Sequence, residues 1–249
     1  MIKSFKQKSN RKSNRKSNRN RNSNKNKQIP RNINEFFKYY KKFKISDKDY
    51  NDYKLNMNKV IKNISGNVYQ LADNWFSQIN IYNYKNKPIT YLEIGAHYGS
   101  NLISVALSYG SHKNSKLYAI DPWLDYDEYP EYKDEQNKIY NTFINNIDTS
   151  GIKDKVVIKR GYSNIEVPKF QDEFFDIIYI DGNHEPEFVL EDAVLSFRKL
   201  KKNGIMIFDD YGWGGPALTM KGIDAFVSGY YKKIKVIAIV KTQFFLQKI

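Results

Sequence analysis

The chain has no cysteine among its 249 residues, and this absence narrows its chemistry. It excludes disulfide bonds and thiolate metal ligands, and it fits a reducing, intracellular compartment. A run of about 18 apolar residues is also missing, so the sequence predicts neither a membrane-spanning helix nor a membrane partner. The basic N-terminus lacks the apolar stretch of a secretory signal. We therefore expect a cytoplasmic, non-secreted protein, with a nuclear or virion-associated placement left open.

Acidic residues are absent from the first 34 positions, which contain 12 lysines and arginines. All 27 acidic residues lie in the remaining 215 positions together with 29 lysines and arginines, so that part has a net charge of only +2. The formal charge of +14 is therefore concentrated in one terminal segment. Within this segment, three consecutive copies of KSNR occupy positions 8–19.

Residues 1–32 contain few apolar side chains, so folding could not offset the entropy lost on ordering, and we predict a disordered, basic, low-complexity tail. Two interpretations of it stay open. Its cations could neutralise nucleic-acid phosphates or form a nuclear-targeting patch. It could equally be a solubilising extension, because it lacks the interleaved aromatic residues that stack on bases.

Residues 33–87 are predicted to form a helical cap in front of residues 88–249. Aromatic residues recur in its first part, at Phe36, Phe37, Tyr40 and Phe43. A second stretch, 68–79, has apolar residues at the four-residue spacing of a helix face, at Leu71, Trp75 and Ile79. Such a stripe is typical of core packing.

Short apolar stretches alternate with helical patterns from residue 88 to residue 249, which predicts a doubly wound, mostly parallel α/β sheet. The expected strands are 89–94, 116–121, 155–160, 175–181, 205–208, 234–240 and 244–249. About three residues separate the last two strands, which permits a hairpin but no parallel crossover. The best-specified helix begins at Pro186, carries Lys199, Lys201 and Lys202 at its C-terminus, and is followed by Gly204.

Residues 91–101, YLEIGAHYGSN, form the most informative stretch: a buried strand, a glycine turn and a helix start. Gly95 and Gly99 have no Cβ, so the backbone there can lie close to a small ligand. Glu93 would repel a pyrophosphate and attract an ammonium or sulfonium group. The dinucleotide fingerprint and the P-loop motif are both absent. Asp121 ends the next strand, at about the spacing where such folds place a carboxylate on ribose hydroxyls.

This glycine loop, followed by a strand-ending Asp121, resembles motif I and the next acidic motif of class I S-adenosylmethionine-dependent methyltransferases. Residues 174–213 are similar to the second half of O-methyltransferases of the macrocin and aminocoumarin sugar type, and to methyltransferase domains with a D-G-x-H motif. The similarity covers about residues 88–230. It implies a seven-stranded Rossmann-like sheet in which the fourth and fifth strands are neighbours and the last strand inserts against the others.

The resemblance also implies a cofactor and a set of site residues. S-adenosylmethionine would contact Gly95 and Gly99, with Glu93 at its amino-acid end and Asp121 on its ribose. His97, inside the glycine loop, is expected to be a contact on the cofactor side. Asp125, Asp127 and Glu128 are expected in a solvated acidic loop, with a lid as an alternative.

A Mg²⁺ site is implied at Asp181, Asp209 and Asp210, because crowded carboxylates at neighbouring strand ends need a cation and oxygen ligands suit Mg²⁺. The sugar enzymes place a general base two positions after the first of these ligands. This chain has Asn183 there, which cannot accept the proton. The next residue, His184, is the predicted base, and Asp181 is predicted to be a catalytic residue as well.

The leading hypothesis is therefore Mg²⁺-assisted methyl transfer from S-adenosylmethionine to a hydroxyl of a small molecule or sugar. Two alternatives stay open: a nucleic-acid methyltransferase recruited by the basic tail, and a non-catalytic cofactor-binding or scaffold protein. The chain lacks the NPPY-type motif of amino-methylating enzymes, which disfavours the first alternative. Neither the acceptor nor an oligomeric state can be read from the sequence.

Overall fold

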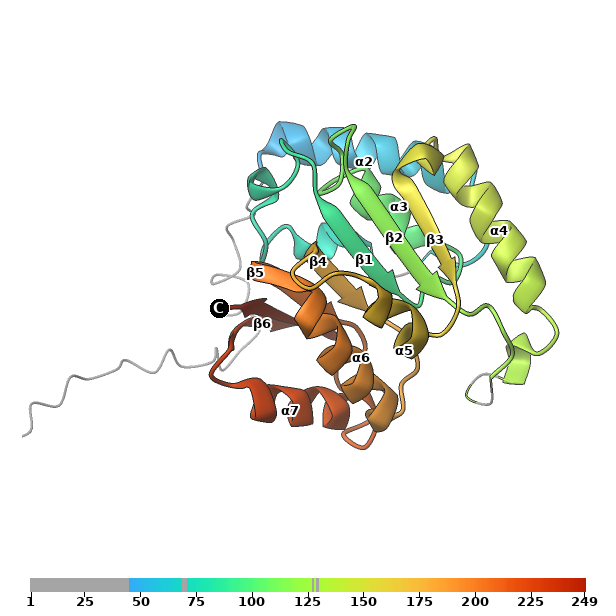
Figure 1. Cartoon of the computed structure of the whole chain (residues 1–249). Coiled ribbons are helices and arrows are strands. Elements are labelled where there is room, and N and C mark those ends of the chain that lie inside the picture. Colours follow the sequence, from blue (N-terminus) through green and yellow to red (C-terminus); the bar gives the residue numbers. More distant parts are fainter. Residues whose placement is uncertain (1–44, 69–70, 127, 129) are drawn as a thin grey trace, which may run out of the picture. The chain divides into compact units, whose positions relative to one another are not determined.

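The predicted strands pair into one sheet in the order β3-β2-β1-β4-β5-β7-β6 (Figure 1). The structure is a computed structural model, and it describes residues 45–68, 71–126, 128 and 130–249. The strands of this described part are β1 (Thr90–Ile94), β2 (Lys116–Asp121), β3 (Val156–Arg160), β4 (Phe175–Ile180), β5 (Leu200–Phe208), β6 (Ile234–Val240) and β7 (Gln243–Lys248).

The central strand β1 has two parallel neighbours, β2 and β4. β3 extends the parallel part beside β2, and β5 extends it beside β4. β7 then pairs antiparallel with both β5 and β6. The strand order reverses at β1, between β2 and β4, which is where doubly wound sheets bind their ligands. The predicted fold class, a mostly parallel seven-stranded sheet, is confirmed, as is the pairing of the fourth and fifth strands.

Helices cover both faces of this sheet (Figure 1). One face carries α2 (Asp47–Ile61), α3 (Ser100–Ala106) and α4 (Gln136–Thr149). The other face carries α5 (Ser163–Glu166), α6 (Pro186–Lys199) and α7 (Thr219–Tyr230). Short 3₁₀ helices lie in the connections, at Ala72–Trp75, Ile81–Asn83, Pro130–Tyr132, Lys153–Lys155 and Val167–Lys169.

The alternation of side chains along each strand divides the core into two layers. Tyr91 and Tyr179 lie in the layer that contains Phe143 of α4. Their strand neighbours Leu92 and Ile178 lie in the layer of α6 and α7. Because both faces are buried, the strands read as nearly continuous apolar runs, as expected for a parallel sheet.

Two local predictions were wrong. β5 begins at Leu200, not at residue 205, so Lys201 and Lys202 belong to the strand and only Lys199 ends the helix. Leu200 pairs with Phe175, and a register shift then accommodates the extra residues before the regular ladder resumes.

The stretch 68–79 is also not a continuous α-helix, because its described part contains only the 3₁₀ turn Ala72–Trp75. The Ala72 N–H donates to Ser104 Oγ (2.8 Å) and Trp75 Nε1 donates to Gln243 Oε1 (3.1 Å), so the segment is anchored against the sheet. Trp75 and Ile79 are nevertheless buried, as the apolar stripe predicted.

The predictions for residues 1–32 and for the aromatic positions Phe36, Phe37, Tyr40 and Phe43 lie outside the described residues. So does Asp127 of the acidic loop. In the part of the chain that is described, no helix has both the length and the apolar character needed to cross a bilayer.

Candidate active site

The glycine loop between β1 and α3 has a conformation that requires glycine at two positions. Gly95 and Gly99 both have a φ of 83°. A Cβ on Gly95 would come within 1.8 Å of the Asp181 carbonyl oxygen, and one on Gly99 would come within 2.8 Å of the Phe143 ring. The loop therefore packs directly against the residues that follow β4 and against α4.

Asp121, at the end of β2, ties this loop to the connection that follows its own strand. Its carboxylate accepts the His97 N–H (2.9 Å) and the Trp123 N–H (2.8 Å). Trp123 Nε1 donates in turn to the His97 carbonyl (3.1 Å). Burial raises the pKa of Asp121, although the backbone N–H donors oppose that shift. Each carboxylate oxygen has two lone pairs, so these bonds leave Asp121 able to accept from a ligand as well.

Glu93 points into the layer between β1 and α3, where it is only 2% exposed. Its Oε2 accepts the Tyr91 hydroxyl (2.6 Å) and Asn101 Nδ2 (3.0 Å). Burial raises the pKa of Glu93 to about 8, even though these bonds and one from the Leu102 N–H favour the ionised form. Glu93 thus lies beside the glycine loop, and its hydrogen-bond donors among the described residues are all neutral.

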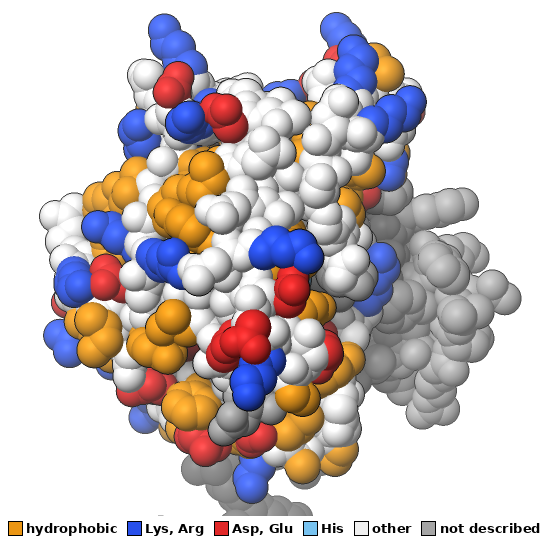
Figure 2. All heavy atoms as spheres, turned by 90° about the vertical axis from the view of Figure 1, so that its right-hand side faces the viewer, with side chains coloured by type: hydrophobic (Ala, Val, Ile, Leu, Met, Phe, Trp, Pro, Cys, Tyr) orange, Lys and Arg blue, Asp and Glu red, His pale blue; other side chains and the backbone are white. Residues whose placement is uncertain are grey.

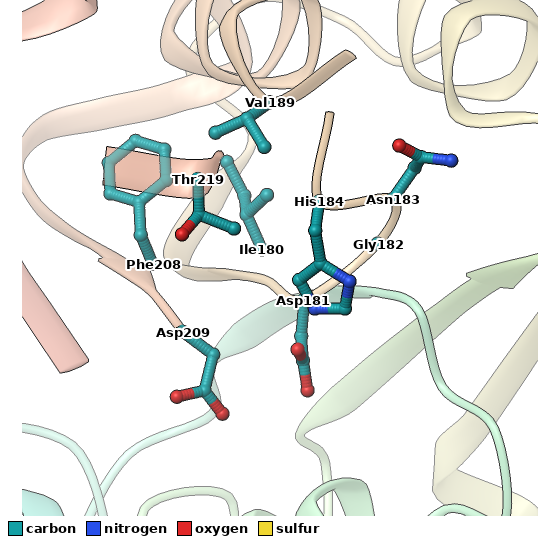
Figure 3. A pocket seen from close by; sticks show the side chains of 9 residues that line it. All are labelled: Ile180, Asp181, Gly182, Asn183, His184, Val189, Phe208, Asp209 and Thr219. Carbon is teal, nitrogen blue, oxygen red and sulfur yellow. The ribbon is translucent and has the colours of Figure 1, made fainter. Parts of the chain in front are cut away.

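A second group of polar residues lies at the ends of β4 and β5. Asp181, His184 and Asp210 each offer a ligand atom, and these atoms all lie within 4.8 Å of one another. The Asp181 N–H donates to the Ile94 carbonyl (2.9 Å) and so continues the parallel ladder past the end of β4. Burial and the neighbouring carboxylates of Asp209 and Asp210 raise the pKa of Asp181 well above its usual range. Figure 3 shows the Asp181 carboxylate directly beside the His184 ring.

Asp209 is not part of this group, in contrast to the predicted set of three aspartates. Its carboxylate accepts the Tyr179 hydroxyl and the Asp210 N–H (2.9 Å), and Thr242 Oγ1 lies 3.4 Å away. The side chain is 4% exposed, and burial raises its pKa to about 6. The physical reason is that Asp209 continues β5, whereas Asp210 turns away with a φ of 55°. The group of ligand atoms that the structure brings together thus contains His184 and not Asp209.

His184 lies between two carboxylates. Its Nδ1 meets Glu128 Oε1, its Nε2 meets Asp210 Oδ2 (2.9 Å), and its ring packs on Trp213 at 4.9 Å between centroids. Burial disfavours the charged imidazole, but the bonds to Asp210 and Glu128 outweigh this and raise its pKa to about 10. In this arrangement His184 holds a proton on both nitrogens, so the predicted role as a base requires that it first releases one of them.

The remaining predicted residues have local roles. Glu128 is not a solvated residue, because it bonds to both the ring and the backbone N–H of His184. Asn183 Oδ1 accepts the Glu185 N–H (2.8 Å) just before α6. His97 packs on Tyr98 and Tyr132, and burial lowers its pKa to about 4. A cavity of about 10 Å³, room for roughly one water molecule, lies beside Asp181 and Asp209 (Figure 3).

Sequence reasoning missed Asn101, Tyr179, Thr219 and the contact made by Glu128. Asn101 could have been found, because it follows the glycine loop at the first turn of the next helix. The Thr219 hydroxyl donates to the Asp210 carbonyl, and the Glu128 contact joins residues 56 positions apart. No signal in a single sequence reports such contacts, because they depend on how the chain folds.

Residues 92–211 match the family described as "Methyltransferase domain". A curated relative, an uncharacterised protein of Acanthamoeba polyphaga mimivirus, is 30% identical over 131 residues. That match covers 51% of this chain and 54% of the relative, so it spans about half the length of the relative.

Solved methyltransferase structures share the fold. One is a putative O-methyltransferase from Klebsiella pneumoniae, with a TM-score of 0.55, 15% identity and coverage of 87% of this chain and 94% of that one. Another is the O-methyltransferase from Bacillus cereus in complex with SAH, with a TM-score of 0.55, 15% identity and coverage of 78% and 90%. Residues 92–211 thus resemble a methyltransferase domain, and the strand order agrees with the class I methyltransferase fold that the sequence resemblance predicted.

Proposed function

We propose that the protein is an S-adenosylmethionine-dependent O-methyltransferase that acts on a hydroxyl of a small molecule or sugar. One observation carries this proposal: carboxylates gather at the ligand-binding ends of four strands, and in the described chain none forms an ion pair with lysine or arginine. These carboxylates are Glu93, Asp121, Asp181, Asp209 and Asp210. Buried like charges need a compensating cation. S-adenosylmethionine carries both a sulfonium and an ammonium group.

The glycine loop supports the same proposal. The loop follows the central strand β1 at the reversal of strand order, which is where doubly wound sheets bind their ligands, so its backbone would lie against the cofactor. Asp121 would accept the ribose hydroxyls, and Glu93 would hold the amino-acid end. When bound, S-adenosylmethionine supplies an electrophilic methyl group. The residues at the ends of β4 and β5 would orient the acceptor oxygen and receive its proton.

A divalent cation fits the second group of residues. Asp181 and Asp210 offer oxygen ligands and His184 offers a nitrogen ligand, all within the 4.8 Å mutual distance given above. Such a cation would lower the pKa of an acceptor hydroxyl. Two carboxylates suit Mg²⁺, whereas an imidazole in the donor set also suits transition metals such as Fe²⁺ or Zn²⁺. We keep Mg²⁺ as the proposed ion, held by Asp181 and Asp210.

His184 is proposed as the base in this arrangement. Its Nε2 lies against Asp210 in the present structure. If Asp210 turned to a cation, the pKa of His184 would fall and Nε2 could release its proton to solvent. The neutral ring could then accept the proton of the acceptor hydroxyl. Asp209 would act indirectly, because its carboxylate holds the Asp210 N–H.

Calorimetry on the full chain tests the proposal. S-adenosylmethionine should bind, and Mg²⁺ should bind to the wild type but not to Asp181→Asn or Asp210→Asn. Asp148→Asn is the matched control, because Asp148 is an exposed carboxylate that pairs with Lys153 on the surface. An intact protein that binds no S-adenosylmethionine would contradict the enzyme proposal and favour the scaffold alternative. If the wild type bound S-adenosylmethionine but no Mg²⁺, the metal site would be refuted and the proposal of methyl transfer would stand.

A nucleic-acid acceptor is the second candidate, and the concentration of positive charge in residues 1–34 favours it. The face of the molecule in Figure 2 has basic, acidic and hydrophobic side chains interspersed, without a continuous basic stripe. The proposed recruitment of nucleic acid therefore rests on the charge of the tail and not on this face. Methylation of RNA by the full chain, lost on deletion of residues 1–32, would support this candidate over a small-molecule acceptor.

A further inference from the structure

A chain of buried polar side chains runs from the 3₁₀ turn that contains Trp75 to the residues that follow β5. Trp75 Nε1 donates to Gln243 Oε1 (3.1 Å), and Gln243 Nε2 donates to the Tyr179 hydroxyl (3.3 Å). The Tyr179 hydroxyl donates to Asp209 Oδ2, while Asp209 Oδ1 accepts the Asp210 N–H (2.9 Å). All of these bonds are donated toward the Asp209 carboxylate, which is their final acceptor.

The burial of this chain indicates a role beyond packing. The side chains of Trp75, Gln243, Tyr179 and Asp209 are each no more than 4% exposed. Buried polar groups cost stability unless they are fully paired, and apolar side chains of the same volume would fill the space without that cost. Consecutive hydrogen bonds in a buried chain polarise and strengthen one another. The chain therefore holds the Asp209 carboxylate in one orientation.

Asp209 determines in turn the conformation of Asp210. The φ of 55° at Asp210 is a left-handed conformation, which costs free energy for a residue with a Cβ. The residue is held there by the bond from its N–H to Asp209 and by the bond from the Thr219 hydroxyl to its carbonyl. In this conformation Asp210 Oδ2 lies 2.9 Å from His184 Nε2, and the Asp210 carboxylate belongs to the group of ligand atoms with Asp181.

We propose that Tyr179 is a positioning residue that, through Asp209, keeps the Asp210 carboxylate turned toward the other ligand atoms. Gln243 orients the Tyr179 hydroxyl, so the first residue of β7 also contributes to the geometry at the end of β5. The effect of Tyr179 on a bound cation rests on the proposed function. Its effect on the Asp210 backbone does not.

Hydrogen exchange of the Asp210 amide, followed by NMR on the full chain, tests the positioning directly. Tyr179→Phe removes one hydroxyl and keeps the ring. Asp209 then loses a donor, so the Asp210 amide should exchange about tenfold faster than in the wild type. Tyr109→Phe is the matched control, because Tyr109 is equally buried in the same core layer and its hydroxyl donates to the Ile79 carbonyl (3.1 Å). It should leave the Asp210 amide unchanged.

Calorimetry supplies a second readout, at the proposed cation. Tyr179→Phe should weaken Mg²⁺ binding by about tenfold, which is typical for loss of a residue that orients a metal ligand. It should leave the affinity for S-adenosylmethionine within about twofold, because the described bonds of the hydroxyl go to Asp209 and Gln243. If Tyr179 acts through Asp209, the double variant Tyr179→Phe/Asp209→Asn should lose no more Mg²⁺ affinity than the weaker-binding single variant.

Each outcome supports or contradicts the inference. An Asp210 amide that exchanges at the same rate in Tyr179→Phe and Tyr109→Phe would overturn it, whatever the metal result. Equal losses of Mg²⁺ and S-adenosylmethionine affinity would overturn it too, because Tyr179 would then support the whole edge of the sheet. If the wild type binds no Mg²⁺, the proposed metal site is refuted and hydrogen exchange alone decides.

A second variant covers the case in which Tyr179→Phe does not fold. Gln243→Met keeps the length of the side chain but removes the donor to the Tyr179 hydroxyl. It should also accelerate exchange of the Asp210 amide, and an unchanged rate would contradict the inference.

Discussion

At the scale of single residues, Asp121 connects two loops and is also the proposed ribose ligand. Asp121→Ala removes the acceptor for the His97 and Trp123 N–H groups as well as the acceptor for the ribose. We expect S-adenosylmethionine binding to weaken by about 1.5–3 kcal/mol, measured by calorimetry. Asp121→Asn, which keeps the size and one acceptor oxygen, should lose less. Unchanged affinity in a folded Asp121→Ala variant would remove Asp121 from the site.

Asp192 on α6 predicts a pH dependence of stability. The residue is 4% exposed, and burial raises its pKa to about 7 from 3.8, against a hydrogen bond from Ser163. Between these two values the folded protein keeps a proton that the unfolded chain releases, so this residue lowers stability as pH rises from about 4 to about 7. Asp192→Asn should therefore raise the free energy of unfolding at pH 8 by roughly 1–3 kcal/mol, with little effect at pH 4.

Urea denaturation at both pH values checks this prediction. The control is Asp148→Asn, which changes an exposed carboxylate and should shift neither value. A gain of the same size at pH 4 and pH 8 would show that the effect of Asp192→Asn is packing and not ionisation.

Asp209 and Asp210, the two aspartates after β5, show what could and could not be predicted from the sequence at this scale. Their position at the edge of the sheet could be predicted, because a strand of apolar residues ends there. It could not be predicted which of the two faces His184. The orientation of the two side chains depends on the φ of 55° at Asp210 and on the hydroxyls of Tyr179 and Thr219. These partners come from other parts of the chain.

At the scale of secondary-structure elements, the β1–α3 turn is specified by Gly95. Gly95→Ala would require a Cβ 1.8 Å from the Asp181 carbonyl oxygen at a φ of 83°. The β4 connection would have to move, so we expect a loss of roughly 3 kcal/mol or more in the free energy of unfolding. Gly151→Ala is the matched control, because Gly151 also has a positive φ (71°) but a Cβ added there would have no atom within 4 Å.

Gly151→Ala should cost only the strain of a left-handed residue, roughly 1–2 kcal/mol. Thermal melts of the two variants, followed by circular dichroism, give the comparison. Equal shifts in the two variants would mean that the close approach between the glycine loop and β4 contributes nothing.

At this scale, elements with a long or clearly periodic sequence pattern were predicted more accurately than short ones. Long apolar stretches located the strands to within a few residues, and Pro186 marked the start of α6 correctly. α5 was missed, because a four-residue helix has too few positions to show a period. The register shift that begins β5 early depends on pairing with Phe175, so it is a property of the assembled sheet.

At the scale of the whole molecule, charge and fold are separated along the chain. Deleting residues 1–32 removes most of the net positive charge but few apolar side chains. We expect the melting temperature to change by no more than about 2 °C, measured by scanning calorimetry. A much larger drop would show that this segment contributes to the stability of the fold.

The position of β7 has a consequence for synthesis of the protein. β7 follows β6 in the chain, yet it lies between β5 and β6 in the sheet (Figure 1). A ribosome that has completed β6 has therefore produced two strand edges whose shared partner does not yet exist. Trp75, made much earlier, also waits for its hydrogen-bond acceptor on Gln243. Exposed strand edges invite pairing with other chains. Nascent chains that stop before residue 243 should accordingly depend on chaperones far more than the full chain does.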